Sequence, residues 1–239
     1  MRAKGGYSAA VGRSGTSLLV VVVCAVAAAG AAGAATSPKA LRAAILKAAS
    51  AKHSVHYVVV GSRPGSRIKM VSDVAANRGI QRVTFSKSGR TGHATTVVVK
   101  STAYVRGDAF ALHAYMRLPA SFAARYAGKW IAIPHTSPLY RPEAIDVTFG
   151  SFINDGVPQH HLSLVSGIVG GRRLKGLRGT APEGGILTLY IRASGRPLPV
   201  EGKEVVRGAY PATSRVRMSR WNEPVRVQAP AHAIPLPGT

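Results

Sequence analysis

The stretch STAYVRGDAFALHAYMRLPASFAARYAGKWIAIP, residues 101–134, decides the fold that this sequence predicts. Its first residues, 102–106, have the composition of a short strand. Leu118, Phe122 and Tyr126 then recur at every fourth position, which places them on one face of a helix. We therefore expect an apolar helix over one face of a sheet, with room for a ligand if the gap between them is open.

Short runs of β-forming residues separated by turn signals lie on both sides of this stretch. They predict strands at 53–60, 67–74, 80–86, 94–100, 187–191, 198–206 and 216–218. Turns such as Pro64-Gly65 and Ser88-Gly89 join them, which is typical of an antiparallel meander. Two more helices are expected, at 37–52 and at 143–153.

The order of these elements resembles the LolA/LppX-like lipoprotein carrier family, in its actinobacterial LppX/LprG-type branch. The motifs that carry the resemblance are YVRG (104–107), GKWI (128–131), LTLYIRASGRPLPVE (187–201) and VRMSRWNEPVRVQAP (216–230). The resemblance implies an α+β fold: a curved antiparallel β-sheet, an unclosed half-barrel, with helices covering its concave face. It also implies that acyl chains bind in the gap and that lipids or lipoproteins are carried between membranes.

The first 34 residues have the features of an export signal. Arg2, Lys4 and Arg13 precede an apolar segment, 18–29, and Ala32-Gly33-Ala34 offers a small-residue cleavage site. The alternative interpretation is an uncleaved membrane anchor, because residues 18–35 together are just long enough to span a bilayer. Residues 35–239 then form a single domain with a loose, proline-rich tail from about residue 229.

Cys24 is the only cysteine of the chain. Lipidation of a cysteine needs a small residue before it, and Val23 stands there instead. A cysteine inside the export signal leaves the exported domain without disulfides and without a cysteine nucleophile.

The charge is strongly positive, with a formal net value of +23 at pH 7. Such a field attracts anionic lipids, envelope polymers or nucleic acid, and export excludes nucleic acid as a partner. The densest basic run supplies four candidate contacts to an anionic membrane surface: Arg172, Arg173, Lys175 and Arg178. The alternative is a solvated strand edge, where positive charge deters edge pairing.

The sequence contains no recognisable catalytic or metal-binding motif, so we expect no enzyme, no cofactor and no metal. Glu143 and Asp146 are spaced for one helical face, but they fall where a helix begins and the helix dipole favours acids. His160 and His161 are neighbours, and neighbouring side chains of a strand point to opposite faces, which disfavours joint chelation.

A hydrophobic cavity is the remaining candidate site. Its predicted roof is Phe122, Tyr126, Phe149 and Phe152, and its predicted floor is Val58, Met70, Phe85 and Val97. An ordinary filled core is the alternative. The first hypothesis is an exported, non-enzymatic, monomeric carrier of a lipid, an acylated glycolipid or a lipoprotein, secreted or held at the outer face of the cytoplasmic membrane. The second is a basic envelope scaffold with a closed core that binds anionic polymers.

Overall fold

The computed structural model describes residues 37–150, 153, 156–181, 184–208 and 211–236. The helical elements are α1 (Pro38–Ser50), α2 (Ala109–Ala114), α3 (Ala120–Tyr126), α4 (Tyr140–Ala144) and the 3-10 helix η1 (Ile145–Val147). The strands are β1 (Ser54–Arg63), β2 (Ser66–Ala75), β3 (Arg78–Lys87), β4 (Arg90–Val99), β5 (Thr102–Gly107), β6 (Ile131–Pro134), β7 (His160–Val169), β8 (Arg172–Thr180), β9 (Ile186–Ile191), β10 (Pro199–Val206), β11 (Ala212–Ser219) and β12 (Ile234–Pro235).

All twelve strands belong to one sheet, in the order β12-β6-β5-β4-β3-β2-β1-β11-β10-β9-β8-β7. Every pairing is antiparallel except that of β12 with β6. The sheet is curved and its two edge strands do not meet, so it is a half-barrel rather than a barrel. The predicted α+β fold with an unclosed antiparallel sheet is confirmed.

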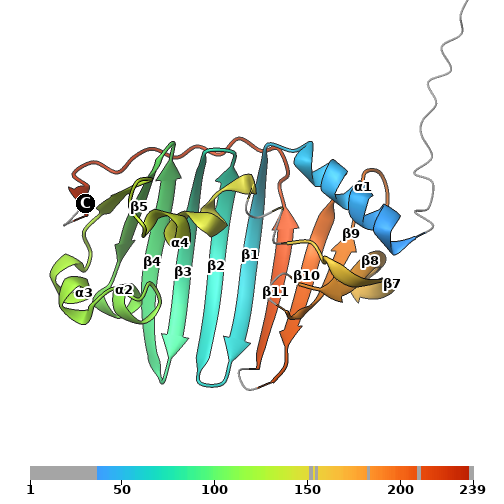
Figure 1. The fold of residues 1–239 in the computed structure, drawn as a ribbon, viewed down its shortest axis with the longest axis horizontal. Helices are drawn as coiled ribbons and strands as arrows, with labels where there is room; N and C mark the ends of the chain where they lie inside the picture. Colours follow the sequence, from blue (N-terminus) through green and yellow to red (C-terminus); the bar gives the residue numbers. More distant parts are fainter. Residues whose placement is uncertain (1–36, 151–152, 154–155, 182–183, 209–210, 237–239) are drawn as a thin grey trace, which may run out of the picture. The chain divides into compact units, whose positions relative to one another are not determined.

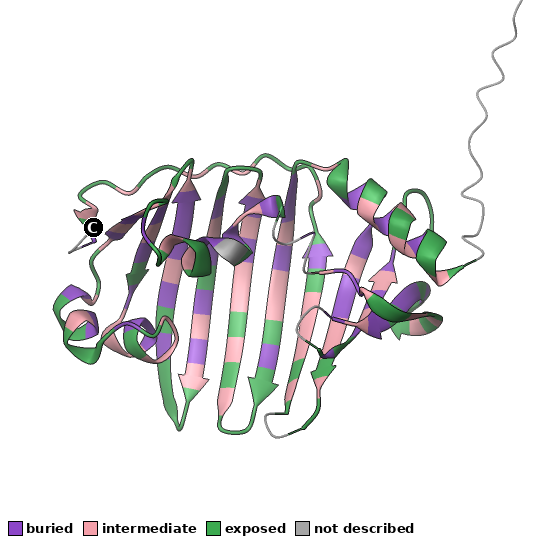
Figure 2. Ribbon diagram, in the orientation of Figure 1, coloured by how far each residue is buried: buried purple, intermediate pink, exposed green. Residues whose placement is uncertain are grey.

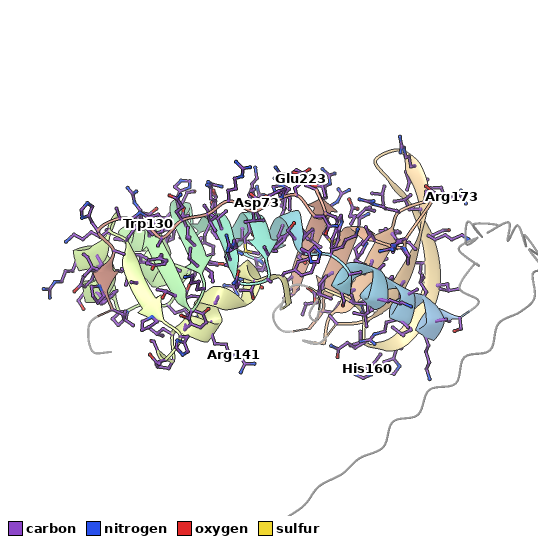
Figure 3. The ribbon with its side chains drawn as sticks, turned by 90° about the horizontal axis from the view of Figure 1, so that it is seen from above. Asp73, Trp130, Arg141, His160, Arg173 and Glu223 are labelled. Carbon is purple, nitrogen blue, oxygen red and sulfur yellow. The ribbon has the colours of Figure 1, made fainter. Side chains whose placement is uncertain are left out.

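The helices lie over one face of the sheet, which we call the inner face (Figure 1). Helix α1 packs near β7–β9, α2 and α3 lie near β4–β6, and α4 with η1 crosses the face between them (Figure 1). Seen from above, Arg141 of α4 lies on this side, whereas Asp73 and Glu223 lie on the other side, the outer face (Figure 3). Two separate apolar clusters result, one under α1 and one under α2 and α3.

Helix α1 forms as the sequence predicts. Ser37 is its N-cap, and its side-chain oxygen accepts a hydrogen bond from the backbone N–H of Ala40 at 3.1 Å. Pro38 occupies the first turn, where its missing N–H costs nothing. Leu41, Ile45 and Ala49 are buried in the cluster under the helix.

The middle of the chain contains more and shorter helices than the sequence predicts. Asp108 caps α2, a helix that was not expected, by accepting from the N–H of Ala111 at 2.8 Å. The predicted helix at 143–153 is broken at Thr148, whose backbone is extended. Helical structure resumes at Phe149, and Phe152 lies outside the described residues.

Glycine lets the helical cover approach the inner face closely. A Cβ atom at Gly79 of β3 would overlap with the carbonyl oxygen of Val147 in η1. The side chains of Tyr57 and Gln81 donate hydrogen bonds to the carbonyl oxygen of Asp146, which holds η1 against the sheet. Gly79 falls between the predicted strands 67–74 and 80–86, but in the structure it belongs to β3, where it pairs with Val74 and leaves room for η1.

The C-terminal segment crosses the outer face and ends in the sheet (Figures 1 and 3). The N–H of Ile234 donates to the carbonyl of Trp130 at 2.8 Å, and the N–H of Leu236 donates to that of Ala132 at 3.0 Å. Leu236 is buried in the cluster under α2 and α3. Within the predicted tail, Ile234 and Pro235 therefore form the edge strand β12, which pairs with β6.

In the part of the chain that the structure describes, every helix is too short or too polar to cross a membrane. The predicted export signal, residues 1–34 with Cys24, lies outside the described residues.

Candidate functional site

A hollow of about 350 Å³ lies on the inner face, between the parts of the sheet that the helices cover. Its floor is a row of directly paired residues that runs across five strands: Phe85, Ile68, Gly61, Ser214 and Glu204. Gly61 and Ser214 carry little side chain, so the floor is low at its centre. The row lies toward the hairpin turns, where Figure 2 shows exposed strand ends.

Aromatic side chains form one wall of this hollow. Tyr115, the C-cap residue of α2, lines it together with Phe85, and their ring centroids are 5.7 Å apart. Phe110 stacks on Phe85 from the other side, with centroids 6.0 Å apart. The Tyr115 hydroxyl donates to the sulfur of Met70 at 3.7 Å, so the wall is joined to the next row of the floor. This wall is mostly apolar.

Arginine residues surround the hollow at the hairpin end. Arg63, Arg67 and Arg117 line it directly. Arg63 and Arg117 also line an adjoining hollow of about 560 Å³, together with Lys87 and Arg90. The rim is therefore strongly positive, and among the described residues Glu204 is the one carboxylate that lines the main hollow.

A second acid lies near the tyrosine wall. Burial raises the pKa of Glu143 in α4 from 4.5 to about 7. The pKa of the Tyr115 hydroxyl is raised mainly by burial and further by the charges of Asp146 and Glu143. Glu143 thus changes its charge close to neutral pH, beside the residue that forms the wall of the hollow.

We expect Glu143→Gln to remove a pH dependence of stability. An acid whose pKa is raised in the folded state stabilises that state only while it is protonated, so stability falls as the pH rises from about 4.5 to about 7. Between pH 5 and pH 8 the free energy of unfolding of the natural chain should fall by about 2 kcal/mol relative to that of the Gln variant. This corresponds to a fall in melting temperature of roughly 4–8 °C. Thermal unfolding of both proteins at the two pH values measures this, and parallel pH profiles would refute it.

The structure divides the predicted cavity floor between two faces of the sheet. Phe85 lines the hollow, and Met70 borders it through Tyr115. Val58 and Val97 point to the outer face, since Val58 pairs with Val71 and Val97 pairs with Ile80. Grouping them with Met70 and Phe85 was wrong, because a side chain one position out of phase on a strand points to the opposite face.

Three of the four aromatic residues of the predicted roof, Phe122, Tyr126 and Phe149, lie in the packed clusters on either side of the hollow. Tyr126 is buried under α2 and α3, and Phe122 packs on it with ring centroids 4.3 Å apart. Phe149 is buried in the other cluster, edge-on to Trp221 at 6.3 Å. These side chains do not line the hollow.

The basic run lies on β8, the strand next to the edge strand β7. Its four cations, Arg172, Arg173, Lys175 and Arg178, are exposed. Because β8 pairs on both sides, the run is not a strand edge, and edge protection does not explain it.

The clearest polar cluster outside the hollow lies on the outer face. Arg220 and His56 both contact the carboxylate of Asp73, at 2.9 and 2.8 Å. Glu223 lies 3.8 Å from the Nε atom of Arg220, at the start of the C-terminal segment. Among the described residues, no group of three or more His, Cys, Asp or Glu is placed to hold a metal ion.

Sequence reasoning missed the residues that define the hollow, above all Gly61, Ile68 and Tyr115. Ile68, Met70 and Val74 alternate along β2 and share the inner face, but the alternation alone does not show which residues of the neighbouring strands lie beside them. The missing information was the register between strands, which decides which residues of β1, β2 and β11 share a row.

No protein-family model and no curated protein matches the sequence. Solved structures do match. LprF from Mycobacterium bovis matches with a TM-score of 0.52 and 16% identity over 81% of this chain and 97% of that one. An uncharacterized conserved protein from Thermus thermophilus matches with a TM-score of 0.42 and 14% identity over 83% of this chain and 98% of that one. The LolA superfamily protein NE2245 from Nitrosomonas europaea matches with a TM-score of 0.32 and 11% identity over 81% of this chain and 96% of that one. The likeness to LprF confirms the predicted LolA/LppX-like fold.

Proposed function

We propose that this protein is an exported, non-enzymatic carrier that holds the acyl chain of a lipid or of an acylated glycolipid or lipoprotein in the hollow on the inner face. The observation that carries the proposal is the hollow itself, an apolar space of about 350 Å³ whose one end is surrounded by arginines. Pockets for small ligands commonly have volumes of about 300–1,000 Å³.

The lining suits a hydrocarbon chain. Ile68, Phe85 and Tyr115 offer apolar surface that a bound chain would remove from water. Each CH₂ group buried there contributes about 0.8 kcal/mol, so roughly ten such groups are enough for micromolar binding before the costs of ordering are subtracted. The affinity therefore comes from the chain and depends little on salt.

The rim favours a lipid whose headgroup is anionic. The guanidinium groups of Arg63 and Arg117 match the geometry of phosphate or carboxylate oxygens. With the chain between sheet and helices, the headgroup would lie at the hairpin end, close to these side chains. Binding and release at this open end, without a covalent step, would constitute the transport.

The decisive test is mass spectrometry of the organic extract of the full chain, purified from a host that exports it. We expect about one lipid per protein molecule, with at least one long acyl chain and an anionic headgroup. A folded, monodisperse protein without lipid would refute the carrier function. That outcome would favour the basic envelope scaffold, which binds anionic polymers and loses them as the salt concentration rises.

A further inference from the structure

We propose that the outer face of β1, β10 and β11 docks on an anionic membrane surface. The docking patch consists of three valines, Val58, Val60 and Val205, and three cations, Lys203, Arg215 and Arg217. These six residues line a shallow hollow of about 510 Å³ on the face away from the described helices. The inference goes beyond lipid carriage, because the patch lies on the opposite side of the sheet from the proposed acyl site.

The patch is continuous because its members are direct neighbours across strands. Arg215 of β11 pairs with Val60 of β1 on one side and with Lys203 of β10 on the other. Arg217 pairs with Val58 in the same way. Apolar and basic side chains therefore alternate over one continuous area of the outer face, a composition that favours interfacial membrane binding.

The valines are unusually exposed for their size. The exposed fraction is 54% for Val60 and 40% for Val205. A membrane interface would remove this apolar surface from water, which a soluble polyanion would not do to the same extent. This is why we favour a lipid surface over an envelope polymer as the occupant.

A buried acid organises the cations and leaves the patch positive. The carboxylate of Glu201, which is fully buried, lies 2.6 Å from Arg215, 3.4 Å from Arg217 and 3.5 Å from Lys203. One negative charge faces three positive ones, so net positive charge remains for a partner. Lys203 also lies over the ring of Tyr190, 5.6 Å from its centroid, which fixes its direction.

One residue of the basic run, Arg178, belongs to the same face. Arg178 of β8 pairs with Thr188 of β9, and Thr188 pairs with Lys203. Arg178 therefore extends the patch along the same cross-strand row, whereas Arg173 and Lys175 are out of phase with it on β8.

The test is sedimentation of the full chain with vesicles of phosphatidylcholine alone or with one third phosphatidylglycerol. The double variant Lys203→Gln/Arg217→Gln keeps Arg215, the nearest partner of Glu201, so the fold should persist. Each cation near an anionic surface is worth about fivefold in binding, so we expect the double variant to bind anionic vesicles roughly 25-fold more weakly. Neutral vesicles should bind the natural chain and the variant equally weakly.

The matched control removes the same net charge from the inner side. Lys39 of α1 and Arg141 of α4 are both exposed, and Lys39→Gln/Arg141→Gln should reduce binding no more than about twofold. All variants share the same N-terminus, so a difference between them belongs to the substituted face. Equal losses in the two double variants would overturn the proposal, because net charge alone would then explain the binding.

A second pair of variants tests the apolar part. Val60→Ser/Val205→Ser should weaken binding to anionic vesicles by about tenfold, since less apolar surface enters the interface. Leu139→Ser, at an exposed position before α4, is the matched control and should bind normally. Unchanged binding of the valine variant, together with equal affinity for a soluble polyanion, would overturn the membrane assignment. Lipid loading should be the same in all these proteins, so failure of the docking proposal is distinguishable from failure of the carrier function.

Discussion

Ile68→Asp should abolish the lipid load of the exported protein. Ile68 lies in the floor row of the hollow, between Phe85 of β3 and Gly61 of β1. A carboxylate at this position would have to give up its hydration for every bound acyl chain, which costs several kcal/mol and exceeds the gain from the few CH₂ groups nearby. The amount of lipid extracted per protein molecule should fall at least tenfold, measured by quantitative mass spectrometry.

Val60→Asp provides the matched control, because it places the same charge one position before Gly61 on the outer face. It should retain the full lipid load and weaken only the binding to anionic vesicles. Thermal unfolding establishes that both variants are folded. If Ile68→Asp is folded and still carries a stoichiometric lipid, the hollow is not the acyl site.

Gly79→Ala should have the largest effect on stability. The added Cβ atom would overlap with the carbonyl oxygen of Val147 and lie 3.1 Å from that of Asp73, and both are backbone atoms that cannot rotate away. Either η1 moves off the sheet or the strand distorts. We expect a loss of about 3 kcal/mol, which corresponds to a fall in melting temperature of roughly 6–12 °C.

Gly150→Ala is the matched control for this substitution. A Cβ atom at Gly150 meets no atom within 4 Å, and helical structure includes this position. Alanine should be neutral or slightly stabilising there, because it restricts the unfolded chain. A melting temperature of Gly79→Ala equal to that of Gly150→Ala would show that η1 does not pack as closely as described.

The sequence allowed the fold class to be predicted because local signals repeat along the chain. Two-residue turns such as Ser88-Gly89, where both residues have positive φ, separate strands of regular length and identify the hairpins without knowledge of any long-range contact. Helix α1 was equally predictable from the sequence, because Ser37 and Pro38 mark its start.

The candidate site was less predictable because it depends on long-range register. The local hairpin places Val59 opposite Met70 on the inner face, but only the pairing of β1 with β11 and β10, in the last part of the chain, brings Ser214 and Glu204 into the same row as Gly61. The continuous apolar run in β1 carries no alternation that would reveal its inner face. Likewise, the helical spacing of the apolar residues around Tyr126 and Phe149 fits a cavity roof and a filled core equally well. In the structure both side chains are buried in filled cores.

The pairing of β1 with β11 and of β6 with β12 also determines when the chain can fold. Both edges of the β1–β6 meander are completed by residues 212–236, so the first six strands have no finished sheet until the last part of the chain is present. Closing such long segments of chain is slow, because the entropy of closure is lost before the contacts between the paired strands can stabilise the fold. If the protein is exported, this late closure keeps the nascent chain unfolded, and therefore able to pass through a narrow channel, until its C-terminal strands have followed it across.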